Sequence, residues 1–148
     1  MLKLPPPMWA MVFLGLCALA SWALDWPAIP LPHHEPIGIA IFFIGWIPAV
    51  LAFRAFRLAG TELDPTSDAN YAFITSGPYR FSRNPMYLGL TFATFGMALW
   101  VGSWPMLIAP IAVFVTANWA HIPFEEAKMR RQYGAEFDAY AEKVRRWV

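Results

Sequence analysis

The stretch MYLGLTFATFGMALWVGSWPMLIAPIAVFVTANWA, residues 86–120, contains no Asp, Glu, Lys or Arg. Apolar residues fill 86–101 and 105–120, and the uncharged turn Gly102-Ser103-Trp104-Pro105 separates them. Each run is about long enough for a helix that crosses a bilayer, and so short a turn joins antiparallel neighbours. The stretch therefore predicts an antiparallel hairpin of two transmembrane helices, with a kink at Pro110.

Two further apolar runs precede the hairpin, at 8–24 and at 37–52 with an extension toward Leu58. Pro48 bends the second helix, which membrane helices tolerate. In the first run, Ala18-Leu19-Ala20 resembles a signal-peptidase site, whereas Trp22 and Trp26 are typical interfacial anchors of a retained helix. Both readings of the first run stay open. No run alternates with period two, so we predict an all-α polytopic membrane protein with about four transmembrane helices.

The composition agrees with a membrane protein. Of 148 residues, 58% are hydrophobic and 14% are charged, whereas soluble domains carry about 25% charged residues. The single cysteine excludes an intrachain disulfide and a cysteine metal cluster. A net charge of +1 gives no support for a nucleic-acid partner. His33-His34-Glu35 has no third ligand nearby, so we also expect no metal site.

Ten of the eleven Lys and Arg residues lie in two segments of the chain, and the other is Lys3. Residues 25–36 and 102–105 contain no Lys or Arg, whereas the segment before the hairpin and the tail after it contain ten: Arg54, Arg57, Arg80, Arg83, Lys128, Arg130, Arg131, Lys143, Arg145 and Arg146. The positive-inside rule then predicts four spans with both termini in the cytoplasm. We expect one domain over 1–148, with two transmembrane helices in 1–58 and the hairpin and C-terminal helix in 59–148.

The segment TSGPYRFSRNPMYLG, residues 75–89, predicts a polar corner where the hairpin begins. Asn84 is a preferred N-cap residue and Pro85 suits a first helical position. A helix start offers free N–H groups and a positive dipole end to an anion. Nearby side chains suit a small anionic, aromatic ligand: Tyr79, Arg80, Arg83 and Tyr87. Alternatively, the arginines only orient the helix and contact lipid headgroups.

Acidic residues follow the hairpin directly, at Glu125 and Glu126. From there the chain reads as one amphipathic helix, with an apolar stripe at spacings of three and four: Met129, Tyr133, Phe137, Tyr140, Val144 and Trp147. The spacing also predicts helix ion pairs of Glu126 with Arg130 and of Glu142 with Arg146. Gly134 predicts a bend in the middle of this helix. This helix either lies on the bilayer surface or folds back over the Arg83-Asn84 corner on the cytoplasmic face.

Together these segments resemble the isoprenylcysteine carboxyl methyltransferase and phospholipid methyltransferase superfamily, as a short member of bacterial type. The resemblance rests on Gly-Pro-Tyr-Arg-x-x-Arg-Asn-Pro-Met-Tyr-x-Gly at 77–89, the hairpin, the Glu-Glu pair and the Tyr-Gly tail, over 59–148. It implies S-adenosylmethionine as methyl donor and a lipophilic acceptor that enters from the bilayer. Asn84 replaces the His of the eukaryotic Arg-His-Pro-x-Tyr element, so this position cannot act as a base.

The resemblance also implies roles for single residues. The expected cofactor-binding residues are Tyr79, Arg83, Asn84, Pro85, Tyr87, Gly89, Glu126, Tyr133 and Phe137, and the expected catalytic residues are Arg83 and Glu125. For an amine or thiol acceptor, Glu125 or His121 would take the proton. We expect the acceptor to enter between the hairpin and the second helix, where Gly89, Ala93 and Gly96 permit close approach. Two alternatives remain: a membrane reductase related to sterol reductases that binds a nicotinamide dinucleotide, and a non-catalytic membrane scaffold.

Overall fold

The computed structural model describes residues 5–60 and 73–148, whose regular elements are all helices, apart from one isolated β-bridge between Ala28 and Ser103. The elements in chain order are α1 (Pro6–Ala23), α2 (His34–Leu58), the 3-10 helix η1 (Gly77–Arg80), α3 (Pro85–Val101), the 3-10 helix η2 (Trp104–Leu107), α4 (Ile108–Thr116), the π-helix η3 (Ala117–His121), α5 (Ile122–Tyr133) and α6 (Ala135–Lys143). The predicted all-α class is confirmed for these residues.

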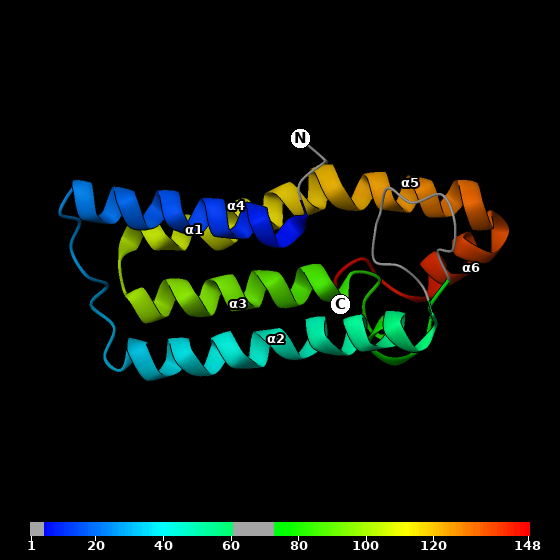
Figure 1. Cartoon of the computed structure of the whole chain (residues 1–148), viewed down its shortest axis with the longest axis horizontal. Coiled ribbons are helices and arrows are strands. Elements are labelled where there is room, and N and C mark those ends of the chain that lie inside the picture. Colours follow the sequence, from blue (N-terminus) through cyan, green and yellow to red (C-terminus); the bar gives the residue numbers. More distant parts are fainter. Residues whose placement is uncertain (1–4, 61–72) are drawn as a thin grey trace.

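Helix α3 lies at the centre of the bundle, with α2 on one side and the α1–α4 pair on the other (Figure 1). It ends at Gly102, and η2 then turns the chain into α4, which packs back along α3. The predicted helical hairpin is therefore confirmed. Pro110 lies in the first turn of α4, where a proline removes no helical hydrogen bond. The irregular turn of this segment is instead the π-helical η3, just before α5.

Three helical segments are long and apolar enough to cross a membrane: α1, α2 and the continuous run 104–133. Helix α3 is also apolar but has only 17 residues, about 26 Å of helix against a hydrocarbon core of about 30 Å. Large apolar side chains point outward from these helices, among them Met11, Leu16, Leu19, Phe43, Ile44, Ile47, Val50, Ile108 and Ile111. Such outward apolar faces suit lipid, and a fourth span formed by α3 stays a prediction.

The backbones of helices α2 and α3 come into direct contact at their glycines. A Cβ atom on Gly96 would collide with the backbone of Phe42, and one on Gly45 would lie 2.5 Å from the backbone nitrogen of Ala93. Gly89 likewise faces α2, where an added Cβ would lie 2.7 Å from the Gly45 carbonyl oxygen. The close approach that the small residues predicted is confirmed. Because backbone meets backbone along this boundary, however, it leaves no room for an acceptor to pass between α2 and α3.

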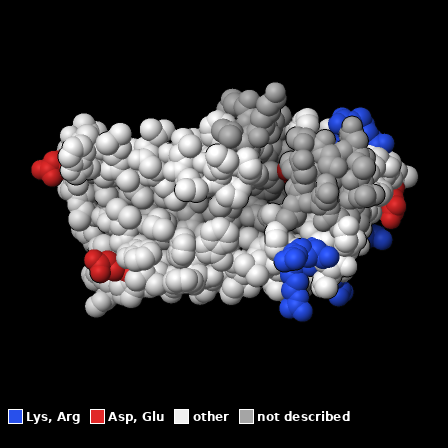
Figure 2. All heavy atoms as spheres, in the orientation of Figure 1, with Lys and Arg blue, Asp and Glu red and all other residues white. Residues whose placement is uncertain are grey.

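The two ends of the bundle differ in charge. On the face shown in Figure 2, the Lys and Arg side chains gather at the end that carries α5 and α6. The charged side chains visible at the opposite end are all acidic. That opposite end holds the turn between α1 and α2, with Asp25 and Glu35. There His34 donates its Nδ1–H to the Leu99 carbonyl oxygen at 2.9 Å, which fastens the start of α2 to the end of α3.

The bend predicted at Gly134 is confirmed, but the prediction that one helix continues to the end of the chain is wrong. Gly134 separates α5 from α6, with φ 51° and ψ −124°, a conformation that strongly favours glycine. After α6 the chain becomes extended at Val144 and runs back along the bundle. There Trp147 donates its Nε1–H to the Asn118 side-chain oxygen at 3.0 Å. Both predicted helix ion pairs are also wrong. Because of this reversal Arg146 pairs with Glu126, and Arg130 pairs with Asp138 across the bend at Gly134.

Candidate active site

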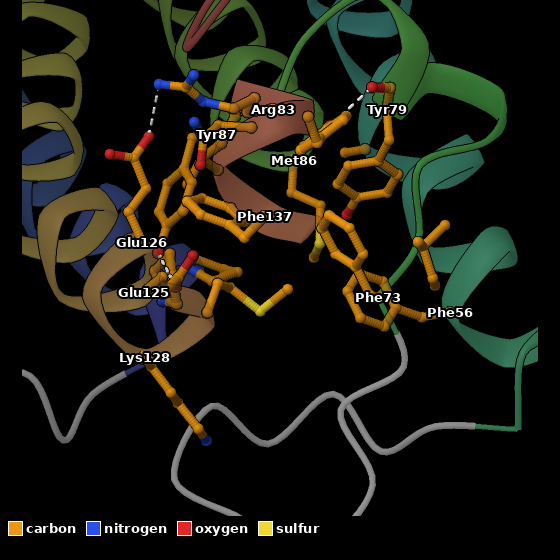
Figure 3. Close-up of a pocket in the computed structure, with 18 of the residues that line it drawn as sticks. Phe56, Phe73, Tyr79, Arg83, Met86, Tyr87, Glu125, Glu126, Lys128 and Phe137 are labelled. Carbon is orange, nitrogen blue, oxygen red and sulfur yellow. Dashed lines mark hydrogen bonds and ion pairs between the residues drawn. The ribbon is translucent and has the colours of Figure 1, made fainter. Parts of the chain in front are cut away.

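The start of α3, the helices α5 and α6 and the C-terminal half of α2 meet around a pocket (Figure 3). Its polar side carries four charged side chains: Arg83, Glu125, Glu126 and Lys128. The remainder is mostly apolar and aromatic, with Trp46, Ala49, Phe56, Phe73, Met86, Leu90, Met129, Phe137 and Tyr140. Pro6 and Pro7 at the start of α1 complete its lining. The pocket therefore joins an ionic corner to an apolar interior, as a site for an amphiphilic ligand requires.

Glu126 is the centre of the ionic corner, because two guanidinium groups bind its carboxylate. Arg83 donates from Nη2 to Oε1 at 2.9 Å. Arg146 donates from Nη2 to Oε2 at 2.7 Å and from Nε to Oε1 at 3.3 Å. The Glu126 side chain is 8% exposed and that of Arg83 14%. A buried carboxylate is tolerated only when it is paired and hydrogen-bonded in this way.

Arg83 also fixes the course of the C-terminal tail. Its Nη1 donates to the carbonyl oxygens of Ala141 at 2.7 Å and Val144 at 3.0 Å. Its backbone N–H donates to the Arg145 carbonyl oxygen at 3.0 Å. These carbonyls lie at and beyond the end of α6, where helical partners run out. One arginine therefore binds the acidic opening of α5, the end of α6 and the tail together.

Asn84 precedes α3 as predicted, but its side chain does not cap that helix. Instead its Nδ2 donates to the Arg146 carbonyl oxygen at 3.0 Å, and Ser82 donates to the same oxygen at 3.3 Å. The Ser82 hydroxyl in turn accepts the backbone N–H of Asn84 at 3.1 Å. The side-chain amide of Asn84 thus holds the C-terminal tail and leaves the first N–H groups of α3 without a side-chain cap.

One donor in the corner is buried and has no acceptor among the described residues, namely Nε of Arg83. An unsatisfied buried donor costs about 1–3 kcal/mol. Arg83 lines the pocket, so a ligand carboxylate could accept this bond, and charge-assisted bonds of this kind are strong. The structure therefore leaves one arginine N–H without an acceptor among the described residues, while the other guanidinium nitrogens bind protein groups.

Glu125 differs from its neighbour Glu126 in its partners. Tyr87 donates its hydroxyl to Glu125 Oε1 at 2.6 Å. The second oxygen of this partly buried carboxylate accepts no hydrogen bond from the described residues. In Figure 3 the Lys128 side chain points away from the Arg83–Glu126 pair. The two adjacent carboxylates therefore differ in their hydrogen bonds: both oxygens of Glu126 accept bonds from arginines, whereas one oxygen of Glu125 can still accept a bond in the pocket.

An aromatic cluster forms the opposite side of the pocket around Phe73. Its ring stacks on Tyr133 with centroids 5.1 Å apart and contacts Tyr140 edge-on at 5.3 Å and Phe137 at 6.1 Å. Tyr140 donates its hydroxyl to the Tyr79 carbonyl oxygen at 2.7 Å. Burial raises the pKa of the Tyr140 phenol to about 12, against the opposing charge of Arg83. Tyr140 is therefore a neutral donor that holds α6 against the segment before α3.

The structure brings most of the predicted site residues to this pocket, namely Tyr79, Arg83, Asn84, Tyr87, Glu125, Glu126 and Phe137. Three others do not line it. Gly89 faces α2, Pro85 is buried at the start of α3, and Tyr133 reaches the pocket only through its stacking on Phe73.

Several residues of the site were not predicted from the sequence. Arg146 was assigned to a helix pair, and Phe73 was not considered at all. No local pattern marks either residue, because both reach the site through chain reversals that separate them widely from their partners in sequence.

Comparison with known proteins places the chain in a family. The family model described as phospholipid methyltransferase matches residues 35–136. Two proteins of Oryza sativa, subspecies indica and japonica, each named probable protein-S-isoprenylcysteine O-methyltransferase, are 35% identical over 116 residues, or 73% of this chain. The chain spans 57% of the length of these relatives.

An uncharacterized protein of Haemophilus influenzae is 32% identical over 63 residues, which is 43% of this chain and all of that protein. No solved structure is significantly similar to the chain. The family match covers α2, α3, α4 and α5 and thus most of the candidate site. On this ground the protein belongs to the phospholipid methyltransferase family.

Proposed function

We propose that this protein transfers a methyl group from S-adenosylmethionine to a lipophilic acceptor at the cytoplasmic face of a membrane. Family membership and the names of the rice relatives support a methyl-transfer reaction. The observation that carries the proposal is the contact of Arg83 with Glu126 at 2.9 Å. It joins the two polar motifs, 43 residues apart in sequence, at one pocket that also has a large apolar part.

The residues of the pocket fit the chemical groups of S-adenosylmethionine. The unsatisfied Nε–H of Arg83 matches the amino-acid carboxylate. The available oxygen of Glu125 matches the amine or the ribose hydroxyls. Phe73, Phe137 and Tyr140 offer flat apolar faces for an adenine ring. When bound, the cofactor supplies an electrophilic methyl group on a positively charged sulfur, so the protein need only position the reactants and exclude water.

The two acids then have different roles. Glu125 contacts the cofactor directly and, for an amine or thiol acceptor, receives the departing proton on its free oxygen. Glu126 positions Arg83 by holding one face of its guanidinium, and Arg146 holds Glu126 from the other side. Tyr87 orients Glu125 through its 2.6 Å hydrogen bond. Asn84 supports the site by holding the tail and takes no part in proton transfer.

The acceptor would reach the pocket between the start of α1 and the middle of α2. Pro7, Trp46, Ala49 and Leu90 line the pocket on this apolar side. The boundary between α2 and α3 is closed by backbone contact. An apolar chain lying on this side would therefore place its polar end toward Glu125.

The orientation follows from the charge distribution and is part of the proposal. The described Lys and Arg residues lie at the end of the bundle that holds the pocket (Figure 2), and the positive-inside rule assigns that end to the cytoplasm. Both ends of the described chain lie near it, since Pro6 lines the pocket and the C-terminal tail binds Arg83 just before α3. The whole of 1–148 would then act as one methyltransferase domain in a bacterial inner membrane.

Isothermal titration of the purified protein in detergent tests the proposal. S-Adenosylhomocysteine should bind, and Glu125→Gln should weaken binding at least tenfold, which corresponds to about 1.4 kcal/mol and is modest for a charge-assisted bond. Glu136→Gln on the exposed side of α6 is the matched control and should bind as wild type. Preference for a reduced nicotinamide dinucleotide would instead identify a reductase, and binding of neither ligand would favour a scaffold.

The methyl acceptor can be identified by comparing the lipids of cells with and without the gene. Cells that carry or lack the gene are fed methyl-labelled methionine, and their lipid extracts are compared. A labelled lipid that requires both the gene and Glu125 supports methyl transfer to a lipophilic acceptor. Label that depends on the gene but appears only in water-soluble products contradicts the acceptor class.

A further inference from the structure

A second groove lies on another face of α2, outside the candidate active site. One side is formed by α2 from Ile47 to Leu58 and by Ala59, and the other by residues 73–78 and 80–82, by Pro85 and Leu88 of α3 and by Val148. Trp46, Ala49 and Phe56 of α2 line the active-site pocket instead. The two cavities therefore use different faces of the same helix, and the methyl-transfer proposal does not account for this groove.

The polar part of the groove is cationic. Arg54 from α2 and Arg80 from η1 both line it and both are exposed. Neither makes a hydrogen bond or ion pair with another described residue, in contrast to Arg83 and Arg146. No described Asp or Glu lines the groove. Two arginines with free donors match an anion, and a phosphate is the group that guanidinium binds best.

The other part of the groove is apolar and faces outward. Ile47 and Leu51 are 53% and 46% exposed, and they belong to the outward apolar face of α2. Phe81, 75% exposed, lies on the opposite side next to Arg80. From Ile47 to Arg54 the helix rises about 10 Å. An occupant of the groove therefore meets hydrocarbon-like surface at one end and paired arginines about two helical turns away.

We infer that this groove binds an anionic phospholipid, with its phosphate between Arg54 and Arg80 and an acyl chain along Ile47 and Leu51. The charge complementarity selects an anionic headgroup over a zwitterionic one. The exposed apolar length selects a membrane lipid over a soluble phosphate. The groove lies at the cation-rich end of the bundle, where interfacial lipid headgroups meet such arginines.

Native mass spectrometry of the full chain tests this inference. The protein is released from zwitterionic phosphatidylcholine nanodiscs that contain a small fraction of phosphatidylglycerol, and retained lipids are counted. Wild type should retain one phosphatidylglycerol, and Arg54→Gln/Arg80→Gln should bind it about thirtyfold more weakly, since each arginine near an anionic headgroup contributes a factor of about five. The matched control Arg57→Gln/Arg131→Gln removes two exposed cations outside the groove and should bind as wild type.

Three results would overturn the inference. Equal loss in both double variants would mean general electrostatic attraction, and equal retention of phosphatidylcholine would remove the anionic selectivity. Competition by millimolar glycerol phosphate would identify a soluble-anion site. A second measurement in wild type avoids any folding defect of the variants: phosphatidylglycerol with a diazirine in its acyl chain should label 47–58 and 81–88. Labelling confined to other segments would contradict the assignment.

Discussion

Replacing Glu126 by Gln removes the charge that two arginines share. The substitution keeps the shape of the side chain and one acceptor oxygen. It replaces the other oxygen by an amide that faces guanidinium donors, so the 2.7 Å bond from Arg146 or the 2.9 Å bond from Arg83 is lost. Glu126 is also the negative partner of an arginine that is 14% exposed. The variant therefore leaves a buried positive charge without its counter-ion.

The size of the effect follows from burial. A charge-assisted hydrogen bond contributes about 1.5–3 kcal/mol, and breaking a buried ion pair from one side costs about 3–5 kcal/mol. Arg146 is 34% exposed and can be hydrated after the change. We therefore expect Glu126→Gln to lower the free energy of unfolding by about 3 kcal/mol, at the low end of that range.

The exposed pair of Arg130 and Asp138 provides a matched control, because it has the same chemistry at 3.0 Å but side chains 50% and 58% exposed. Asp138→Asn should cost less than about 1 kcal/mol. Both variants are unfolded by titrating SDS into mixed micelles, with near-ultraviolet circular dichroism as the readout. Equal effects of the two substitutions would refute the reasoning, because burial would then not decide the strength of the ion pair.

Further changes test other parts of the structure. Gly96→Ala should lower the free energy of unfolding by about 1–3 kcal/mol in the same SDS titration, because its Cβ would collide with the backbone of α2, whereas Gly15→Ala, which has open space, should not destabilise. Tyr87→Phe removes the 2.6 Å hydrogen bond to Glu125 and should weaken S-adenosylhomocysteine binding several-fold in a titration with little loss of stability; unchanged affinity would contradict the orienting role of the hydroxyl. Gly134→Ala should cost about 1–3 kcal/mol at its positive φ, and a thermal melt as high as wild type would show that the bend between α5 and α6 tolerates a side chain.

Local patterns in the sequence predicted the elements of the fold. Uncharged apolar runs predicted α1, α2, α3 and α4, because a helix is the structure that satisfies every backbone group of such a segment within lipid. Asn84-Pro85 predicted the start of α3 to the residue. These signals succeed because each depends only on neighbours a few positions away in the chain.

The candidate site was predicted only in part. The Arg83-Asn84 and Glu125-Glu126 motifs were recognised, and the structure brings them to one pocket. Their partners were not, because Arg146 binds Glu126 from 20 positions away. The apolar stripe predicted a helix, bent at Gly134, that continues to the end of the chain, and it missed the reversal at Val144, since a period of 3.6 carries no information about where the chain turns back.

The sequence by itself therefore determined that the chain is helical and apolar, where α3 starts, and which polar segments are unusual. The tertiary structure decided that Glu126 pairs with two arginines, that Nε of Arg83 has no acceptor among the described residues, and that the boundary between α2 and α3 is closed. The physical reason is range: helix formation and burial depend on residues close in sequence. The pairing of charges and the packing of backbones depend instead on which distant segments the folded chain places within a few ångströms of one another.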